Sequence, residues 1–170
     1  MNPGELEVLV ALVRRAEPKV MIEFGVNEGR TARALLDNVP SLARYVGVDV
    51  EPGYVTAKAV QRREVPRDAG HLAREDARFD LVLRPRGSLD LMPDDLPEAG
   101  AFFIDGDHGF EAVLHDTMLA RALARPGAII IWHDYHGLDT VDVRRVLEGF
   151  SRWGAPIQHV ENTWLAFEVV

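Results

Sequence analysis

Two polar turns carry the residues whose types and spacing are best suited to chemistry. The first is DGDHG, which places Asp105, Asp107 and His108 directly after the apolar run AFFI. The second is HDY, which places His133 and Asp134 directly after the apolar run AIIIW. Carboxylate oxygens and imidazole nitrogens are ligands for Mg²⁺ and for first-row divalent ions such as Mn²⁺, Fe²⁺ and Zn²⁺. We therefore expect a metal site at Asp105, His133 and Asp134. The alternative is a glycine-rich turn whose polar side chains satisfy its own backbone.

A glycine-containing loop follows an earlier apolar strand, in the segment IEFGVNEGRT. Glu23 stands at the end of that strand. Gly25 and Gly29 are four residues apart, and Thr31 opens the next helix. Glycine permits a sharp turn and a close backbone approach, and a helix N-terminus offers unpaired N–H groups. The G-x-G-x-x-G pattern of dinucleotide sites and the lysine of nucleotide triphosphatases are both absent. An acid before the loop favours a ligand whose nearest charge is positive, and an ordinary strand-to-helix turn is the alternative.

The next two strands also end in residues that suit a nucleoside. Asp49 ends one strand, and a carboxylate at such a position can hold a ribose diol through paired hydrogen bonds. Pro52 follows closely, so a helix cap is the alternative role for Asp49. The other strand runs into a turn with Gly87 and Ser88, where small residues leave room for an adenine ring to lie flat.

The elements that must position these residues alternate between short apolar runs and longer helical stripes. This alternation is typical of βαβ units and of a mostly parallel sheet. Helices are predicted from apolar stripes that begin at Leu6, Ala32, Phe110 and Val143. The helix with Val143 is expected to be capped by Asp139 or Thr140. Residues 53–63 are also expected to be helical. Strands are predicted at 19–24, 43–50, 79–83, 101–104 and 128–132. Two further strands, at 156–160 and 164–170, leave no room for a helix between them and predict an antiparallel hairpin.

Composition bounds the class of protein. The chain has 170 residues, 47% of them hydrophobic, and no cysteine, so disulfides and thiolate chemistry are excluded. We expect one domain over residues 1–170. The formal net charge of -8 argues against a nucleic-acid partner. The longest aliphatic run, Val8–Val13, is far short of the ~20 residues that span a bilayer. A soluble, cytoplasmic protein with no membrane partner is therefore expected.

Taken in order, these segments resemble the class I S-adenosylmethionine-dependent methyltransferases. More narrowly, they are similar to small methyltransferases marked by D-G-D-H and H-D-Y turns, which are related to metal-dependent O-methyltransferases of the catechol and macrolide-sugar type. The resemblance covers nearly the whole chain. It implies an α/β, Rossmann-like fold with a seven-stranded, mostly parallel sheet in the order 3-2-1-4-5-7-6. Strand 7 would be antiparallel, and helices would cover both faces.

The resemblance also implies a cofactor and its contacts. S-adenosylmethionine would lie with its methionine part near Glu23 and the loop that follows, its ribose on Asp49, and its adenine beside Ser88. Thr31 would cap the loop. The cofactor-binding set implied in this way is Glu23, Gly25, Asn27, Gly29, Thr31, Asp49, Gly87, Ser88 and Asp105.

The resemblance further implies a reaction, the methylation of a hydroxyl group on a small-molecule or sugar acceptor. His108 lies where the catechol-type enzymes place a lysine base, and Asp107 is the rival base. Those enzymes bind Mg²⁺ through oxygen ligands only, so His133 favours Mn²⁺, Fe²⁺ or Zn²⁺ here. No segment except residues 61–78 could form a lid, so the acceptor pocket is either shallow or completed by another subunit. We therefore expect a homo-oligomer. Two other functions stay open: a cofactor-binding protein without transfer activity, and a metal-dependent hydroxylase on the same fold.

Overall fold

The computed structural model describes residues 1–56, 65–138 and 140–170. Helices and strands alternate along the chain as the apolar pattern predicts. In chain order they are α1 (Glu5–Ala16), β1 (Val20–Phe24), α2 (Arg30–Asn38), β2 (Arg44–Val50), β3 (Phe79–Arg84), the 3-10 helices η1 (Gly87–Asp90) and η2 (Pro93–Asp95), β4 (Ala99–Ile104), α3 (Phe110–Leu123), β5 (Ala124–Trp132), α4 (Val143–Arg152), β6 (Gln158–His159) and β7 (Ala166–Val169).

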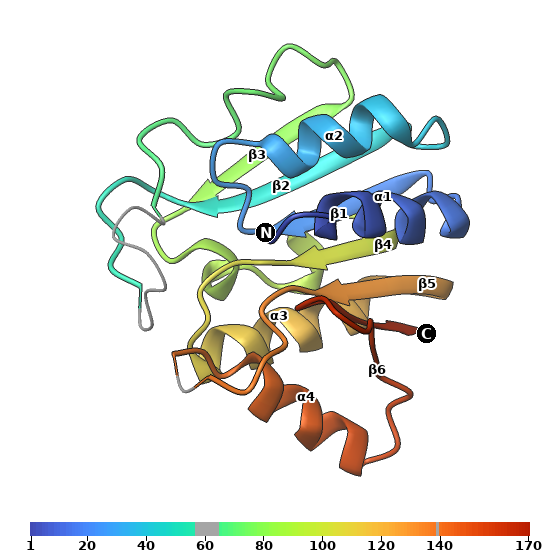
Figure 1. Ribbon diagram of the computed structural model, residues 1–170. Coiled ribbons are helices and arrows are strands. Elements are labelled where there is room, and N and C mark those ends of the chain that lie inside the picture. Colours follow the sequence, from blue (N-terminus) through green and yellow to red (C-terminus); the bar gives the residue numbers. More distant parts are fainter. Residues whose placement is uncertain (57–64, 139) are drawn as a thin grey trace.

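The strands form one sheet in the order β3-β2-β1-β4-β5-β7-β6 (Figure 1). The first five strands in chain order pair in parallel, and β7 is antiparallel to both β5 and β6. The predicted fold class and strand order are confirmed. The short link between β6 and β7 explains the reversal, because a parallel pair needs a crossover of a dozen or more residues.

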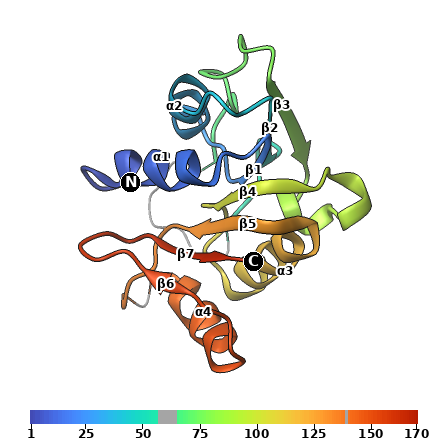
Figure 2. The same cartoon turned by 90° about the vertical axis from the view of Figure 1, so that its right-hand side faces the viewer.

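Helices cover both faces of the sheet, and the side chains of β1 show how the strands serve both layers. Met21 packs in one buried cluster with residues of α1 and α2. Ile22 and Phe24 belong to a second buried cluster with residues of α3 and α4. Figure 2 shows α1 and α2 on one side of the sheet and α3 on the other. Because successive side chains of a strand point to opposite faces, an unbroken apolar run is what a strand covered twice requires.

The edge strand β3 is less buried than its neighbours in the sheet. Its residues are half-buried or exposed, and Asp80 is exposed in its middle. The reason is topological. In the described part of the chain β3 pairs with β2 alone, so one side of it lacks a neighbouring strand.

Two predicted caps are wrong. Helix α4 begins at Val143 with Asp142 at its N-cap, so Thr140 lies before the cap, and Asp139 lies outside the described residues. Helix α2 begins at Arg30 with Gly29 at its N-cap, which places Thr31 one residue inside the helix. The N-cap position of α2 has a φ of 88°, a left-handed conformation that favours glycine over threonine.

The segment between β2 and β3 is built from turns where the structure describes it. Residues 53–56 are not helical, and the rest of the predicted helix at 53–63 lies outside the described residues. Residues 65–78 form turns that pack on the loop after β1. The Gly70 amide donates to the Asn27 carbonyl at 2.7 Å, and the Leu72 amide donates to the Glu28 carbonyl at 3.0 Å. This segment therefore supports the glycine-containing loop.

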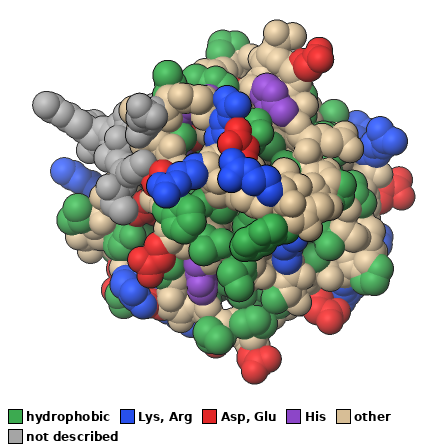
Figure 3. All heavy atoms as spheres, turned by 90° about the horizontal axis from the view of Figure 1, so that it is seen from below, with side chains coloured by type: hydrophobic (Ala, Val, Ile, Leu, Met, Phe, Trp, Pro, Cys, Tyr) green, Lys and Arg blue, Asp and Glu red, His purple; other side chains and the backbone are tan. Residues whose placement is uncertain are grey.

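The surface is mixed in character. Figure 3, which views the molecule from below relative to Figure 1, shows hydrophobic side chains among charged ones on that face. Met118 and Trp153 are among the large hydrophobic residues that the structure leaves exposed, at 58% and 86%. Among the helices of the described residues, none combines the length and the apolar composition that a membrane span requires.

Candidate functional site

A cleft of about 980 Å³ opens at the carboxyl ends of the parallel strands. Its walls come from the loops after β1 to β5, from η1 and from the first residues of the chain. In Figure 1 the arrowheads of these strands point toward this edge of the sheet. Open α/β sheets bind their ligands at this edge, because the loops that follow the strands converge there.

Gly25 is required by a close approach between two backbones. Its φ is 90°, and a Cβ atom at this position would lie 2.3 Å from the carbonyl oxygen of Asp105. The Gly25 amide donates to the Val48 carbonyl at 2.9 Å, and the Asp105 amide donates to the Phe24 carbonyl at 2.8 Å. The loop after β1 thus leaves the sheet between its two neighbouring strands, and both Gly25 and Asp105 line the cleft.

Asp49, at the end of β2, lies in the cleft wall and holds the loop after β1. One carboxylate oxygen accepts a hydrogen bond from the Asn27 amide at 2.6 Å, and the other accepts from the Val50 amide at 2.7 Å. Burial raises the pKa of Asp49, and the backbone hydrogen bonds that it accepts oppose this rise. Asp49 bonds the backbone of a neighbouring loop, so its contacts differ from those of the predicted alternative, a helix cap.

Glu23 does not line the cleft, although the resemblance places it near the cofactor. It is 1% exposed beneath the cleft floor, and its carboxyl accepts a hydrogen bond from the Tyr45 hydroxyl at 2.9 Å. Burial raises the pKa of Glu23 well above its ordinary value, and the nearby Asp105 and Asp49 carboxylates raise it further. Glu23 is therefore a hydrogen-bonded partner of Tyr45 in the protein interior.

Four more residues of the predicted cofactor set lie in the cleft wall. They are Asn27 and Thr31 after β1, and Gly87 and Ser88 in η1. Gly29, which is not in the wall, sits behind it as the N-cap of α2. Gly87 has a φ of 60°, and a Cβ there would lie 3.0 Å from a Val50 methyl carbon, so glycine allows η1 to pack closely on β2.

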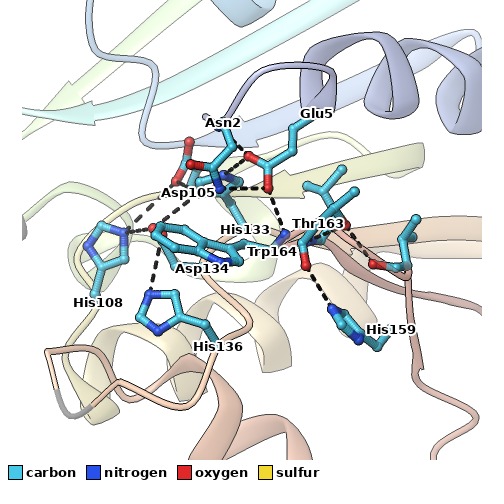
Figure 4. A network of polar contacts seen from close by, with 12 residues as sticks. Asn2, Glu5, Asp105, His108, His133, Asp134, His136, His159, Thr163 and Trp164 are labelled. Carbon is cyan, nitrogen blue, oxygen red and sulfur yellow. Dashed lines mark hydrogen bonds and ion pairs between the residues drawn. The ribbon is translucent and has the colours of Figure 1, made fainter.

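At the other end of the cleft, three side chains could hold a metal ion. Single ligand atoms of Asp105, His108 and Asp134 all lie within 4.8 Å of one another. His108 Nε2 is 2.6 Å from Asp134 Oδ2 and 3.9 Å from Asp105 Oδ1 (Figure 4). His108 and Asp134 are buried, and Asp105 is half-buried. A pair of carboxylates and one imidazole is a donor set that suits a divalent cation.

His133, the third predicted metal ligand, lies beside the converging group but is not one of its three residues. Its Nε2 atom is 3.0 Å from Glu5 Oε2. Its Nδ1 atom is 3.1 Å from Asp134 Oδ2 and 3.3 Å from Asp105 Oδ1, but neither contact has hydrogen-bond geometry. Burial alone would lower the pKa of His133, but the two aspartates outweigh it and raise this pKa to about 11. His108 is the histidine of the converging group, and the role of His133 as a metal ligand stays a prediction.

Asp107 and His108, the two predicted bases, point to different parts of the cleft. Asp107 accepts hydrogen bonds from the Gly109 amide at 2.8 Å and from the Tyr54 hydroxyl at 3.0 Å. His108 instead faces Asp134. Asp107 therefore belongs to the side of the cleft formed by the loop after β2, and His108 to the side formed by the end of β5.

Several residues near the site carried no signal in the sequence. Asn2 and Glu5 come from the amino-terminal segment, and Trp164 comes from the loop between β6 and β7. Glu5 accepts a hydrogen bond from the Trp164 amide at 2.6 Å, and His136 packs on the Trp164 ring with 4.4 Å between ring centroids. Figure 4 shows these residues surrounding His133. Glu5 is 128 residues from His133 and 159 residues from Trp164 in the chain. The topology brings these residues together, so no local sequence pattern predicts their contacts.

Comparisons with known proteins agree with this geometry. A family model described as a methyltransferase domain matches residues 22–135. The hybrid PKS-NRPS synthetase apdA of Emericella nidulans is 25% identical over an alignment of 146 residues, and the match covers 78% of this chain and 3% of that protein. The chain thus spans about 3% of the length of this curated relative.

Two solved structures have the same fold. The O-methyltransferase TomG from Streptomyces achromogenes, which is involved in tomaymycin synthesis and was solved with S-adenosylmethionine, has a TM-score of 0.69 at 16% identity. That match covers 100% of this chain and 81% of TomG. An O-methyltransferase from Bacillus cereus, solved with S-adenosylhomocysteine, has a TM-score of 0.64 at 17% identity and covers 100% of this chain and 82% of that one.

The fold is that of the class I S-adenosylmethionine-dependent methyltransferases. Because the family model matches more than half of its residues, the chain belongs to the methyltransferase domain family.

Proposed function

We propose that the chain transfers the methyl group of S-adenosylmethionine to a hydroxyl group of a small molecule or sugar. One observation carries the proposal: a single cleft joins a nucleoside-sized region around Asp49 and Ser88 to a polar centre at Asp105, His108 and Asp134. A methyltransferase needs both, because its two substrates must meet with the reacting atoms aligned. The TomG and Bacillus cereus structures, both O-methyltransferases, support hydroxyl methylation.

The cofactor end is assigned to the loops after β1, β2 and β3. Asp49 would hold the ribose, since its oxygens keep lone pairs beyond the two amide hydrogen bonds that they accept. The loop around Gly25 would take the methionine part, and Gly87 and Ser88 would lie beside the adenine. The sulfonium group of the bound cofactor supplies an activated methyl group, so the protein contributes mainly position and the exclusion of water.

The acceptor end is assigned to the ends of β4 and β5. Asp105, His108 and Asp134 fit a divalent ion, because their ligand atoms converge and two of the three are carboxylates. A bound ion would lower the pKa of the acceptor hydroxyl. In a site without an ion, His108 is the residue that we assign to the acceptor's proton, because Asp107 is directed toward Tyr54.

We further propose that residues 1–170 act as one methyltransferase domain, that its partner is a small-molecule acceptor rather than a nucleic acid or a membrane, and that it works in the cytoplasm as a homo-oligomer. The net charge of -8 supports the exclusion of nucleic acid.

The test combines binding and turnover. S-adenosylhomocysteine should raise the melting temperature, with about 2.7 kcal/mol of stabilisation at a hundredfold excess over its Kd, and NAD should not. Mass spectrometry should then show methylated product when S-adenosylmethionine is incubated with hydroxylated acceptors and Mn²⁺ or Mg²⁺. An equal effect of NAD, or no effect of S-adenosylhomocysteine at millimolar concentration, would contradict the proposed function.

A further inference from the structure

Asp116 is a buried carboxyl group that none of the assignments above uses. It lies in the middle of α3, is 1% exposed, and its side chain forms part of the cleft wall. Its Oδ1 atom is buried and has no hydrogen-bond partner among the described residues. An unpaired buried polar atom costs about 1–3 kcal/mol, so a partner supplied by a ligand would recover that free energy.

The surroundings of Asp116 place it at one particular end of the cleft. The Ser88 side chain lies beside its carboxyl group and opposes the rise in pKa that burial causes. Ser88 is itself held by α3, because His115 Nε2 lies 2.9 Å from the Ser88 carbonyl oxygen. On the other side, Asp116 Oδ2 lies 3.5 Å from the point that a Cβ on Gly106 would occupy. The carboxyl group therefore sits between η1 and the loop after β4, away from Asp134.

We propose that Asp116 recognises the adenine base by accepting a hydrogen bond from its 6-amino group. The inference rests on the proposed function, because it takes S-adenosylmethionine as the ligand of the cleft. Among the parts of that ligand, the ribose is assigned to Asp49 and the methionine to the loop around Gly25. The base is the part assigned to Ser88, which contacts Asp116 directly.

The chemistry of the two groups is complementary. Adenine presents an amino donor beside a ring-nitrogen acceptor. A carboxylate accepts hydrogen bonds only, whereas a protonated carboxyl group also offers one donor. Burial raises the pKa of Asp116 to about 7, although the neighbouring Ser88 side chain opposes this rise. Near neutral pH the group is therefore available in both forms, and in each of them an oxygen can accept from the 6-amino group.

The experiment compares two ligands in two proteins by calorimetry. The ligands are S-adenosylhomocysteine and its analogue with hydrogen in place of the 6-amino group. The wild type should bind S-adenosylhomocysteine about tenfold more tightly than the analogue, because a lost hydrogen bond leaves Oδ1 unpaired. In Asp116→Leu the two ligands should bind within about twofold of each other. Asp116→Ala is a second, smaller variant with the same expected ratio.

Two controls separate the outcomes. Glu111→Gln changes an exposed acid on the same helix and should keep the wild-type ratio. Asp49→Asn should weaken both ligands by the same factor, because it acts on the ribose. A wild-type ratio near one, or a ratio that stays tenfold in Asp116→Leu and Asp116→Ala, would overturn the role of Asp116 alone. Failure of S-adenosylhomocysteine to bind the wild type would instead overturn the proposed function.

Discussion

The carboxylate of Glu5 lies 3.0 Å from Nε2 of His133, which joins the first turn of α1 to the end of β5. Glu5 is 1% exposed and His133 is 5% exposed. Burial alone would raise the pKa of Glu5, but hydrogen bonds from His133, Trp164 and Asn2 outweigh it and lower this pKa to about 2. The pKa of His133 is raised to about 11. The two residues therefore form a buried, charged pair, and the amino-terminal helix is part of the framework of the site.

Glu5→Gln should lower the free energy of unfolding by about 2 kcal/mol, because it weakens charge-assisted hydrogen bonds to His133 and to the Trp164 amide. Urea unfolding at pH 7 measures the loss. Glu7→Gln, in the same helical turn but exposed, is the matched control and should leave stability unchanged. Equal effects of the two substitutions would mean that the pair with His133 contributes little.

The stability of the wild type should fall relative to Asp116→Asn as pH rises from about 4 to about 7. Burial raises the folded-state pKa of Asp116 to about 7, above the ordinary value near 3.9. The folded state therefore holds this proton more tightly than the unfolded state, and its stability declines as pH rises from about 4 to about 7. We expect Asp116→Asn to gain about 3 kcal/mol on the wild type over this interval. Denaturant titrations of both proteins at each pH test this. A difference that does not change with pH would place the folded-state pKa near its ordinary value.

Gly25→Ala should destabilise the fold by more than about 3 kcal/mol, because the new Cβ atom would meet the Asp105 backbone at 2.3 Å in a left-handed conformation. Gly154→Ala is the control for conformation alone. Gly154 has a φ of 94° but nothing within 4 Å of the added atom, so its loss should be about 1–2 kcal/mol. Thermal unfolding distinguishes the two. If both variants lose the same amount, the close approach to Asp105 relaxes without cost.

Glu168→Gln should cost about 3 kcal/mol of stability. Glu168 is 2% exposed in β7, and Arg121 of α3 binds both of its carboxylate oxygens while packing 4.7 Å above the Phe150 ring. The Arg121 side chain is 30% exposed, so the substitution leaves a partly solvated guanidinium without its buried partner. Glu148→Gln breaks a comparable pair with Arg144 at the surface and should have no measurable effect. Chemical denaturation of the two variants measures the loss of unfolding free energy in each. Equal losses would mean that the burial of Glu168 does not strengthen its pair with Arg121.

Asp134→Asn should abolish Mn²⁺ binding while leaving S-adenosylhomocysteine affinity within about twofold. The substitution removes one charged oxygen ligand from the converging group but does not touch the cofactor end. Calorimetry with MnCl₂ and, separately, with S-adenosylhomocysteine gives both constants. Asp80→Asn, an exposed acid on β3, is the control. If the wild type does not bind Mn²⁺ at neutral pH, the proposed metal site is wrong, and His108 and Asp134 belong to a site that works without an ion.

Much of the fold was readable from local pattern. Apolar runs of strand length between helical stripes predict a parallel sheet because each strand must be buried on both faces, and the short link at residues 161–163 predicts the antiparallel end. The polar residues of the loops were also readable, since Asp49, Asp105 and Asp134 each follow such a run directly. Thr31 and Thr140 were misplaced as caps because helix starts depend on backbone conformation, as the left-handed Gly29 shows.

The tertiary structure alone decided which of these polar groups meet. Local sequence could place Asp105, His108, His133 and Asp134 at strand ends, but it could not show that His108 rather than His133 completes the converging group. That choice depends on Glu5, which is 128 residues from His133 in the chain and holds its Nε2 atom. The unpaired oxygen of Asp116 is likewise a property of packing, because a mid-helix acid is exposed or buried according to what covers it. Hydrogen-bond partners across a sheet follow from three-dimensional proximity, which no local sequence pattern records.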